Sequence, residues 1–184
     1  MLPTPAGTDD GEPMRLHRLL IANRGEIAIR IARAAAELGI ETVGVYAEDD
    51  AASLHLRHVD VVHALRGRGA APYLDADALV AIARLAGCDA VHPGYGFLSE
   101  REDFARACAA ASLRFVGPRP ETLALLGDKT AARALAERCG VPTPRGTAGP
   151  TSLDEAGRFL ASLGPGAAVM VKAVSYTHLT LPTN

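Results

Sequence analysis

The chain has 184 residues, enough for one domain and part of a second. Its 48% hydrophobic and 22% charged residues are typical of a globular protein, and a formal net charge of −2 gives no reason to expect nucleic acid or an anionic membrane as a partner. Aromatic residues make up only 4%, which argues against a base-stacking surface. No apolar run approaches the roughly 18 residues of a membrane helix.

The N-terminus and the cysteines indicate the compartment. Residues 1–15 hold prolines and acids but lack the basic start and apolar centre of a secretory signal, so we expect a disordered lead-in. Cys88, Cys108 and Cys139 form no closely spaced pair, which argues against a disulfide framework and a Cys-rich zinc site. We expect no metal site and a reduced, cytoplasmic location.

Strand and helix signals alternate from residue 17 to residue 116. Apolar runs predict strands at residues 17–22, 41–46, 59–64, 89–92 and 113–116. Apolar residues at helical spacing predict helices at residues 27–38, 75–86 and 100–111, with a short one at 53–57. This alternation indicates βαβ units and an α/β fold with a parallel, doubly wound sheet.

The pattern changes after Gly117. Helices are predicted at residues 122–126, 128–139 and 152–163, and a last strand at residues 168–173. The chain has 17 Arg but only two Lys, a bias that suggests a high-GC coding sequence. Lys129 and Lys172 therefore need an explanation.

The first motif is residues 20–30, LIANRGEIAIR. It runs from a strand into a helix N-terminus, where free N–H groups could meet an anion. It contains a single glycine and is not a dinucleotide fingerprint. A structural turn and a binding loop both remain open.

The second motif is residues 92–100, HPGYGFLSE, at the C-terminal end of a predicted parallel strand. Ligands of open α/β sheets bind outside such strand ends, so we expect this loop and residues 23–26 to emerge at the same edge of the sheet. Gly94 and Gly96 permit a tight backbone, and Tyr95 adds an aromatic face with a polar tip. Glu100 could equally be an acid in the first turn of a helix, and His92 a core histidine.

The third motif joins Gly127, Asp128 and Lys129 to the later run 169–172. Lys129 is predicted in the first turn of a helix, where the dipole is unfavourable for a cation and a phosphate would resolve the conflict. Lys172 is predicted on an apolar strand, where an unpaired ammonium is costly. The alternative is two surface lysines that extend their heads into water.

Two further patterns have simpler interpretations. His55 and His58 could share a face of a short helix, but no third ligand is evident, so a solvated face is expected rather than a metal site. Arg66 and Arg68 are most simply part of a solvated loop.

The tail differs in composition from the rest of the chain. Residues 175–184 contain no Ala, Gly or Arg, although these types dominate the preceding sequence. Residues 174–179, VSYTHL, are what one frame of a common transposase sequencing adapter encodes. We therefore expect residues 174–184 to be a non-native tail, and the natural protein to continue past Ala173.

Taken together and in this order, the three motifs resemble those of biotin carboxylases, the ATP-dependent components of biotin-dependent carboxylases. The resemblance covers residues 16–173. It implies a Rossmann-like domain over residues 16–127 and the beginning of an incomplete ATP-grasp domain over residues 128–173. Carbamoyl-phosphate synthetases and other ATP-grasp enzymes share the fold but are less similar in these motifs.

The resemblance also implies roles for individual residues. In the family, matching positions contact ATP (Lys129, Lys172), lie near the bicarbonate and biotin pocket (Tyr95, Gly96, Glu100) or lie near a homodimer interface (Arg30, Arg33). The glycine-rich phosphate loop, the metal-binding glutamates and the catalytic arginine would follow residue 173. The catalytic residues are therefore expected outside this chain, which by itself should be inactive.

The implied chemistry starts with phosphorylation of bicarbonate by ATP and ends with a carboxylated ureido nitrogen of biotin on a carrier domain. The implied cofactor is Mg²⁺, with Mn²⁺ as an alternative, and the implied partners are a biotin carboxyl carrier and a carboxyltransferase domain or subunit. The final acceptor, an acyl-CoA or keto acid, is not determined. The competing hypotheses are another ATP-grasp ligase and a non-catalytic nucleotide-binding or dimerisation module.

Overall fold

The computed structural model describes residues 15–147 and 149–171. It divides into two compact units, which are described separately. The first unit contains the residues up to Ser99 together with Asp103–Gly117, and the second contains Glu100–Glu102 and the residues from Pro118 onward. Within the described residues, no helix combines the length and the apolar character that crossing a membrane requires.

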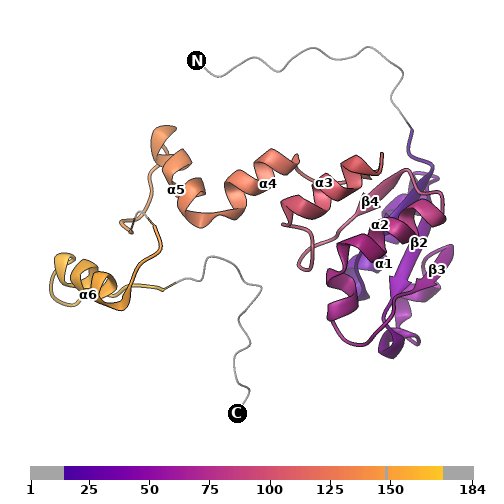
Figure 1. Cartoon of the computed structure of the whole chain (residues 1–184), viewed down its shortest axis with the longest axis horizontal. Coiled ribbons are helices and arrows are strands. Elements are labelled where there is room, and N and C mark those ends of the chain that lie inside the picture. Colours follow the sequence, from indigo (N-terminus) through magenta and orange to yellow (C-terminus); the bar gives the residue numbers. More distant parts are fainter. Residues whose placement is uncertain (1–14, 148, 172–184) are drawn as a thin grey trace. The chain divides into compact units, whose positions relative to one another are not determined.

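The first unit is built on a five-stranded sheet in the order β3-β2-β1-β4-β5. Strands β2, β3 and β4 of this sheet are labelled in Figure 1. Every neighbouring pair is parallel, as the alternation of strands and helices predicted. The strands are β1 (Arg18–Ile21), β2 (Glu41–Tyr46), β3 (Val61–Ala64), β4 (Ala90–His92) and β5 (Arg114–Phe115). The chain adds strands outward from β1 to β3 and then returns to the other side of β1. The strand order therefore reverses between β1 and β4, which is where ligands of such sheets bind.

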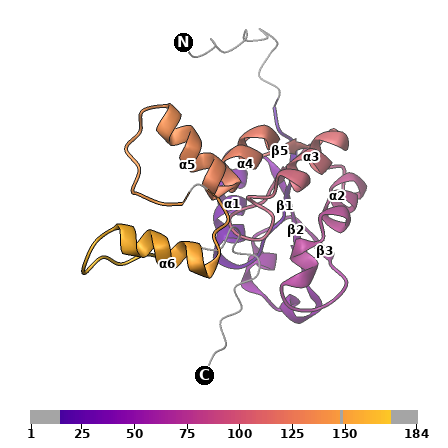
Figure 2. The same ribbon diagram turned by 60° about the vertical axis from the view of Figure 1, so that its left-hand side comes forward.

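Helices cover both faces of this sheet. Helix α1 (Gly25–Glu37) lies on one side, and α2 (Ala76–Leu85) and α3 (Glu102–Ala110) lie on the other (Figure 2). Short 3-10 helices occur in the connections: η1 (Glu48–Asp50), η2 (Leu54–Arg57) and η3 (Ala71–Leu74). The doubly wound arrangement is confirmed.

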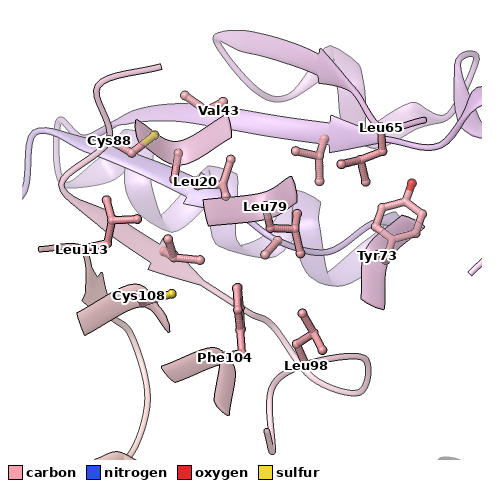
Figure 3. Packing of buried hydrophobic residues seen from close by; sticks show 14 of the residues in the cluster. Leu20, Val43, Leu65, Tyr73, Leu79, Cys88, Leu98, Phe104, Cys108 and Leu113 are labelled. Carbon is pink, nitrogen blue, oxygen red and sulfur yellow. The ribbon is translucent and has the colours of Figure 1, made fainter. Parts of the chain in front are cut away.

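The two faces have separate cores because successive strand residues point to opposite sides. Leu19 and Ile21 of β1 pack with Ile31 and other buried residues of α1. Leu20, between them, packs on the opposite side in a larger cluster that includes Phe104. Figure 3 shows this larger cluster, to which β1, β2, α2 and α3 contribute Leu20, Val43, Leu79, Phe104 and Cys108.

Two expectations for residues 16–127 were wrong. Helix α3 begins at Glu102, so Glu100 lies in the preceding turn rather than in the first helical turn. His55 is only 1% exposed, not part of a solvated face. Its ring is turned inward because Nε2 hydrogen-bonds to the carbonyl oxygen of Val45 at 3.1 Å. His58 is half-buried.

The second unit contains α4 (Pro120–Gly127), α5 (Lys129–Arg138) and α6 (Leu153–Ser162). The Asp128 side chain caps α5 by accepting the N–H groups of Thr130 and Ala131. A reciprocal capping box of Ser152 and Glu155 opens α6. Both helices have good local start signals, yet α5 and α6 bury none of their side chains.

The strand expected at residues 168–173 is not formed over its described part. Residues 168–171 are in no strand, and Val171 is 85% exposed. The apolar run is a local signal, whereas a strand also needs a neighbour to pair its backbone groups. Lys172 and the tail expected at residues 174–184 lie outside the described residues.

Candidate functional site

The first and second motifs meet at one edge of the sheet. Strands β1 and β4 are parallel neighbours with Ile21 opposite His92, and the N–H of Ala22 donates to the carbonyl oxygen of His92 at 2.9 Å. The two following segments therefore leave the sheet side by side, at the point where the strand order reverses. The expectation of a shared edge is confirmed.

Asn23 joins the two loops. Its side chain is 3% exposed, and Nδ2 donates to the carbonyl oxygens of Pro93 at 2.7 Å and Tyr95 at 2.8 Å. Its Oδ1 accepts the N–H of Arg24 at 2.8 Å. A residue 70 positions earlier in the chain thus fixes the backbone of the second motif, and its amide supplies both the donors and the acceptor that these buried groups need.

The two glycines of the second motif are required for different reasons. Both have left-handed backbones, with φ of +67° at Gly94 and +64° at Gly96. A Cβ on residue 94 would lie 2.7 Å from Nδ2 of Asn23, whereas one on residue 96 would meet no atom within 4 Å. Gly94 is therefore needed for close packing as well as conformation, and Gly96 for conformation alone.

His92 takes part in holding this loop. Its Nδ1 lies 3.0 Å from the backbone N–H of Gly94 and accepts it, which leaves the proton of the neutral ring on Nε2. Burial lowers the pKa of His92, which also favours the neutral ring. These observations favour a structural histidine at the base of the loop.

Tyr95 stands at the tip of the loop and is 58% exposed. Its hydroxyl donates to Oε1 of Glu26 at 2.8 Å. This bond to a carboxylate raises the pKa of the Tyr95 phenol. Sequence reasoning placed Glu26 only in the turn that leads into a helix N-terminus, with no partner named for it. The available signal was that Glu26 closely follows β1, which is the parallel neighbour of β4, the strand that precedes the Tyr95 loop.

A second cluster, which sequence reasoning missed, holds Arg24. The guanidinium pairs with Asp50 at 2.9 Å and lies 5.6 Å from the centre of the Tyr73 ring. The Tyr73 hydroxyl donates to Asp50 at 2.8 Å and accepts the N–H of Ala47 at 3.1 Å. Burial alone would raise the pKa of Asp50, but the bonds from Tyr73, Ser53 and Arg24 outweigh it and lower that pKa.

A cavity of about 380 Å³ lies beside α1. Leu19, Ile27, Ile31 and other apolar residues line it, and Arg30 and His92 are its polar side chains. Arg30 and Arg33 are both exposed on α1. Their placement at a homodimer interface stays a prediction.

Lys129 is the first residue of α5, in the helical turn where the sequence placed it. The Asp128 carboxylate already supplies an anion at this helix end, and it occupies the N–H groups of Thr130 and Ala131 at 2.8 and 3.0 Å. The dipole argument for a phosphate is therefore weaker than the sequence indicated, because Asp128 offsets part of the conflict. A phosphate would meet the Lys129 ammonium rather than those two N–H groups.

The remaining predicted residues are less connected to this edge. Glu100 belongs to the second unit, whereas Tyr95 and Gly96 belong to the first, so a common site for them stays a prediction. Lys172 lies outside the described residues. Over residues 15–147 and 149–171, no three His, Cys, Asp or Glu side chains gather closely enough to hold a metal ion.

The fold and the paired loops define a Rossmann-like α/β domain, and comparison with known proteins gives its family. The family described as "Biotin carboxylase, N-terminal domain" matches residues 15–123. The chain belongs to the biotin carboxylase family and carries its N-terminal domain, as the motifs predicted.

Relatives and solved structures agree with this assignment. Mitochondrial pyruvate carboxylase of Mus musculus is 50% identical over 153 residues, which are 81% of this chain and 13% of that protein. The biotin carboxylase domain of a single-chain bacterial carboxylase is 58% identical with a TM-score of 0.77, over 80% of this chain and 34% of that chain.

A third similar protein is the biotin carboxylase domain of Hydrogenobacter thermophilus 2-oxoglutarate carboxylase, whose structure was solved with MgADP and bicarbonate. It is 39% identical with a TM-score of 0.75, over 81% of this chain and 33% of that chain. The chain thus spans a small part of the length of the curated relatives it matches.

Proposed function

We propose that the chain forms the N-terminal part of an enzyme that uses ATP and bicarbonate to carboxylate biotin on a carrier domain. In this enzyme the Tyr95 loop, with Gly96 and Glu100, borders the bicarbonate and biotin pocket. The observation that carries the proposal is the bond from Asn23 to both Pro93 and Tyr95, because it joins two family motifs at the point where the strand order reverses.

Lys129 and Lys172 contribute to binding ATP in this proposal. A compact ammonium is a suitable point charge for a phosphate, and Lys129 begins a helix next to Asp128. The similar domain solved with MgADP and bicarbonate supports a nucleotide site in proteins of this kind. Mg²⁺, or Mn²⁺ in its place, would neutralise phosphate charge, and we assign no residue of this chain to hold it.

The chain by itself should not carboxylate biotin. Helices α5 and α6 have apolar residues at helical spacing but bury no side chains, and residues 168–171 are unpaired with any strand. Within the described residues, α5 and α6 therefore have no buried core that would hold phosphate-binding side chains in a fixed arrangement. Phosphoryl transfer depends on such positioning.

The further parts of the proposal concern the whole enzyme. Its partners are a biotin carboxyl carrier and a carboxyltransferase domain or subunit, and its location is the cytoplasm. It forms a homodimer with Arg30 and Arg33 near the interface. Both arginines are exposed on α1, which is consistent with a surface role.

The test uses the complete carboxylase of which this chain is the N-terminal part. Bicarbonate-dependent ATP cleavage in the presence of free biotin should be strong in the wild type and greatly impaired in Lys172→Ala. Arg68→Ala, which removes an exposed charge from another loop, is the control and should have no effect. Equal activity of Lys172→Ala and wild type would contradict the role of Lys172. Carboxylation of biotin by residues 1–173 alone, above a control without protein, would contradict the inactivity of the isolated chain.

A further inference from the structure

The loop that carries Tyr95 is held at its base and at its tip by different residues. At the base, Asn23 binds the carbonyl oxygens of Pro93 and Tyr95, and His92 binds the N–H of Gly94. These bonds fix the backbone. They do not fix the aromatic ring, which can still turn about its Cα–Cβ bond.

The ring of Tyr95 has little packing to hold it in one rotamer, since 58% of the residue is exposed. Its hydroxyl is bonded to Oε1 of Glu26 at 2.8 Å. A hydrogen bond to a charged acceptor is stronger than a neutral one. This bond therefore selects one direction for an otherwise mobile ring.

Glu26 is well placed to hold a partner in position. It lies in the first turn of α1, whose residues Ala28, Ile31 and Ala32 are buried against the sheet. The positive end of the helix dipole stabilises its carboxylate. Arg30, four residues further along the same helix, also acts on Tyr95. Its positive charge lowers the pKa of the Tyr95 phenol, against the rise that Glu26 causes.

We propose that Glu26 is a positioning residue that fixes the direction of the Tyr95 ring for contact with biotin. The inference rests on the proposed function, in which the Tyr95 loop borders the biotin pocket. Glu26 does not need to touch the substrate in this role, because it acts through the Tyr95 hydroxyl.

The first experiment tests, in this chain and independently of any activity, whether the hydrogen bond to Glu26 fixes the Tyr95 ring. With tyrosine ¹³C-labelled in the ring and at Cβ, NMR measures the χ1 angle of Tyr95 and its phenol pKa, and Tyr95→Phe assigns the signals. Glu26→Ala should average χ1 over several rotamers and lower the phenol pKa. Glu26→Gln should keep one rotamer, because its amide oxygen still accepts the bond, but should also lower that pKa because the charge is lost. A single, unchanged rotamer in Glu26→Ala would overturn the proposal.

The second experiment tests the consequence in the complete carboxylase. Glu26→Ala should raise the KM for free biotin several-fold and leave the KM for ATP unchanged, and Glu26→Gln should restore most of the loss. Combining Glu26→Ala with Tyr95→Phe should add little to Tyr95→Phe alone, because both act through one bond. Glu37→Ala removes an exposed acid from the other end of α1 and is the matched control.

The two experiments separate the possible failures. A ring that turns freely in Glu26→Ala, together with an unchanged KM for biotin, would overturn the placement of Tyr95 beside biotin and so that part of the proposed function. An equal rise of the KM values for ATP and biotin would show a general structural effect and overturn the positioning role.

Discussion

Asn23 and Gly94 approach so closely that a Cβ on residue 94 would lie 2.7 Å from Nδ2 of Asn23. Their contact brings together two loops that begin on neighbouring parallel strands. The same Nδ2 donates to the carbonyl oxygens on either side of Gly94. The arrangement of the two loops at this edge of the sheet thus depends on the side-chain amide of Asn23 and on the lack of a side chain at Gly94.

Gly94→Ala should destabilise the first unit more than Gly96→Ala. Both substitutions place a Cβ on a left-handed backbone, which costs about 1–2 kcal/mol. Only Gly94→Ala also displaces Asn23 and weakens its bonds, which adds about 1–3 kcal/mol. Urea unfolding followed by circular dichroism measures the difference. Equal losses for the two variants would contradict the close contact.

Asn23→Ala should lower the free energy of unfolding by about 1–3 kcal/mol, because two carbonyl oxygens lose their donor. Asn23→Asp should cost at least as much at pH 7, since a carboxylate cannot donate and repels those oxygens. Relative to wild type at the same pH, the aspartate variant should recover in part on acidification, when its carboxyl gains a proton to donate. An aspartate variant as stable as wild type at pH 7 would be incompatible with this bonding.

Phe104→Ala should remove a large part of the packing between α3 and the sheet. The side chain is fully buried, and its ring meets Phe115 edge-on with 5.9 Å between centroids. A loss of about 3–5 kcal/mol is expected for such a cavity-forming substitution. Leu85→Ala is the control because Leu85 is 80% exposed, and it should change the urea midpoint little. Similar midpoints for both variants would show that this core is not formed.

The Asp60 carboxylate should stabilise the first unit at neutral pH and lose this stabilising effect in acid. This carboxylate accepts hydrogen bonds from the backbone N–H and from the hydroxyl of Thr42, both at 2.8 Å. These two bonds, the backbone one most, lower the pKa of Asp60. Because the folded pKa lies below the unfolded value of about 3.9, the contribution is present above that pH and is lost as pH falls towards the folded pKa.

Asp60→Asn should therefore reduce the stability difference between pH 6 and pH 3, as measured by urea unfolding at each pH. Asp77→Asn removes one exposed carboxylate of α2 and corrects for the change in net charge. An unchanged pH dependence in Asp60→Asn would contradict the role of Thr42.

Local patterns in the sequence predicted the order of elements in the first unit, the parallel sheet and the shared edge of the first two motifs. These features follow from local periodicity and from a general property of parallel strands, whose carboxyl ends meet at one edge. The cap of α5 by Asp128 was also predictable, since it involves residues two and three positions apart.

The side chains that hold this edge together could not be predicted from the sequence, because their partners lie far away along the chain. Asn23 and Glu26 bind partners about 70 residues away along the chain. The sequence around Asn23 is equally compatible with a turn that has no such bond, and Glu26 with an acid that only begins a helix. His55 is buried because the carbonyl of Val45 lies in reach, which spacing could not reveal. Residues 168–171 carry a strand pattern without forming a strand, because pairing is a property of two segments and hydrophobic periodicity is a property of one.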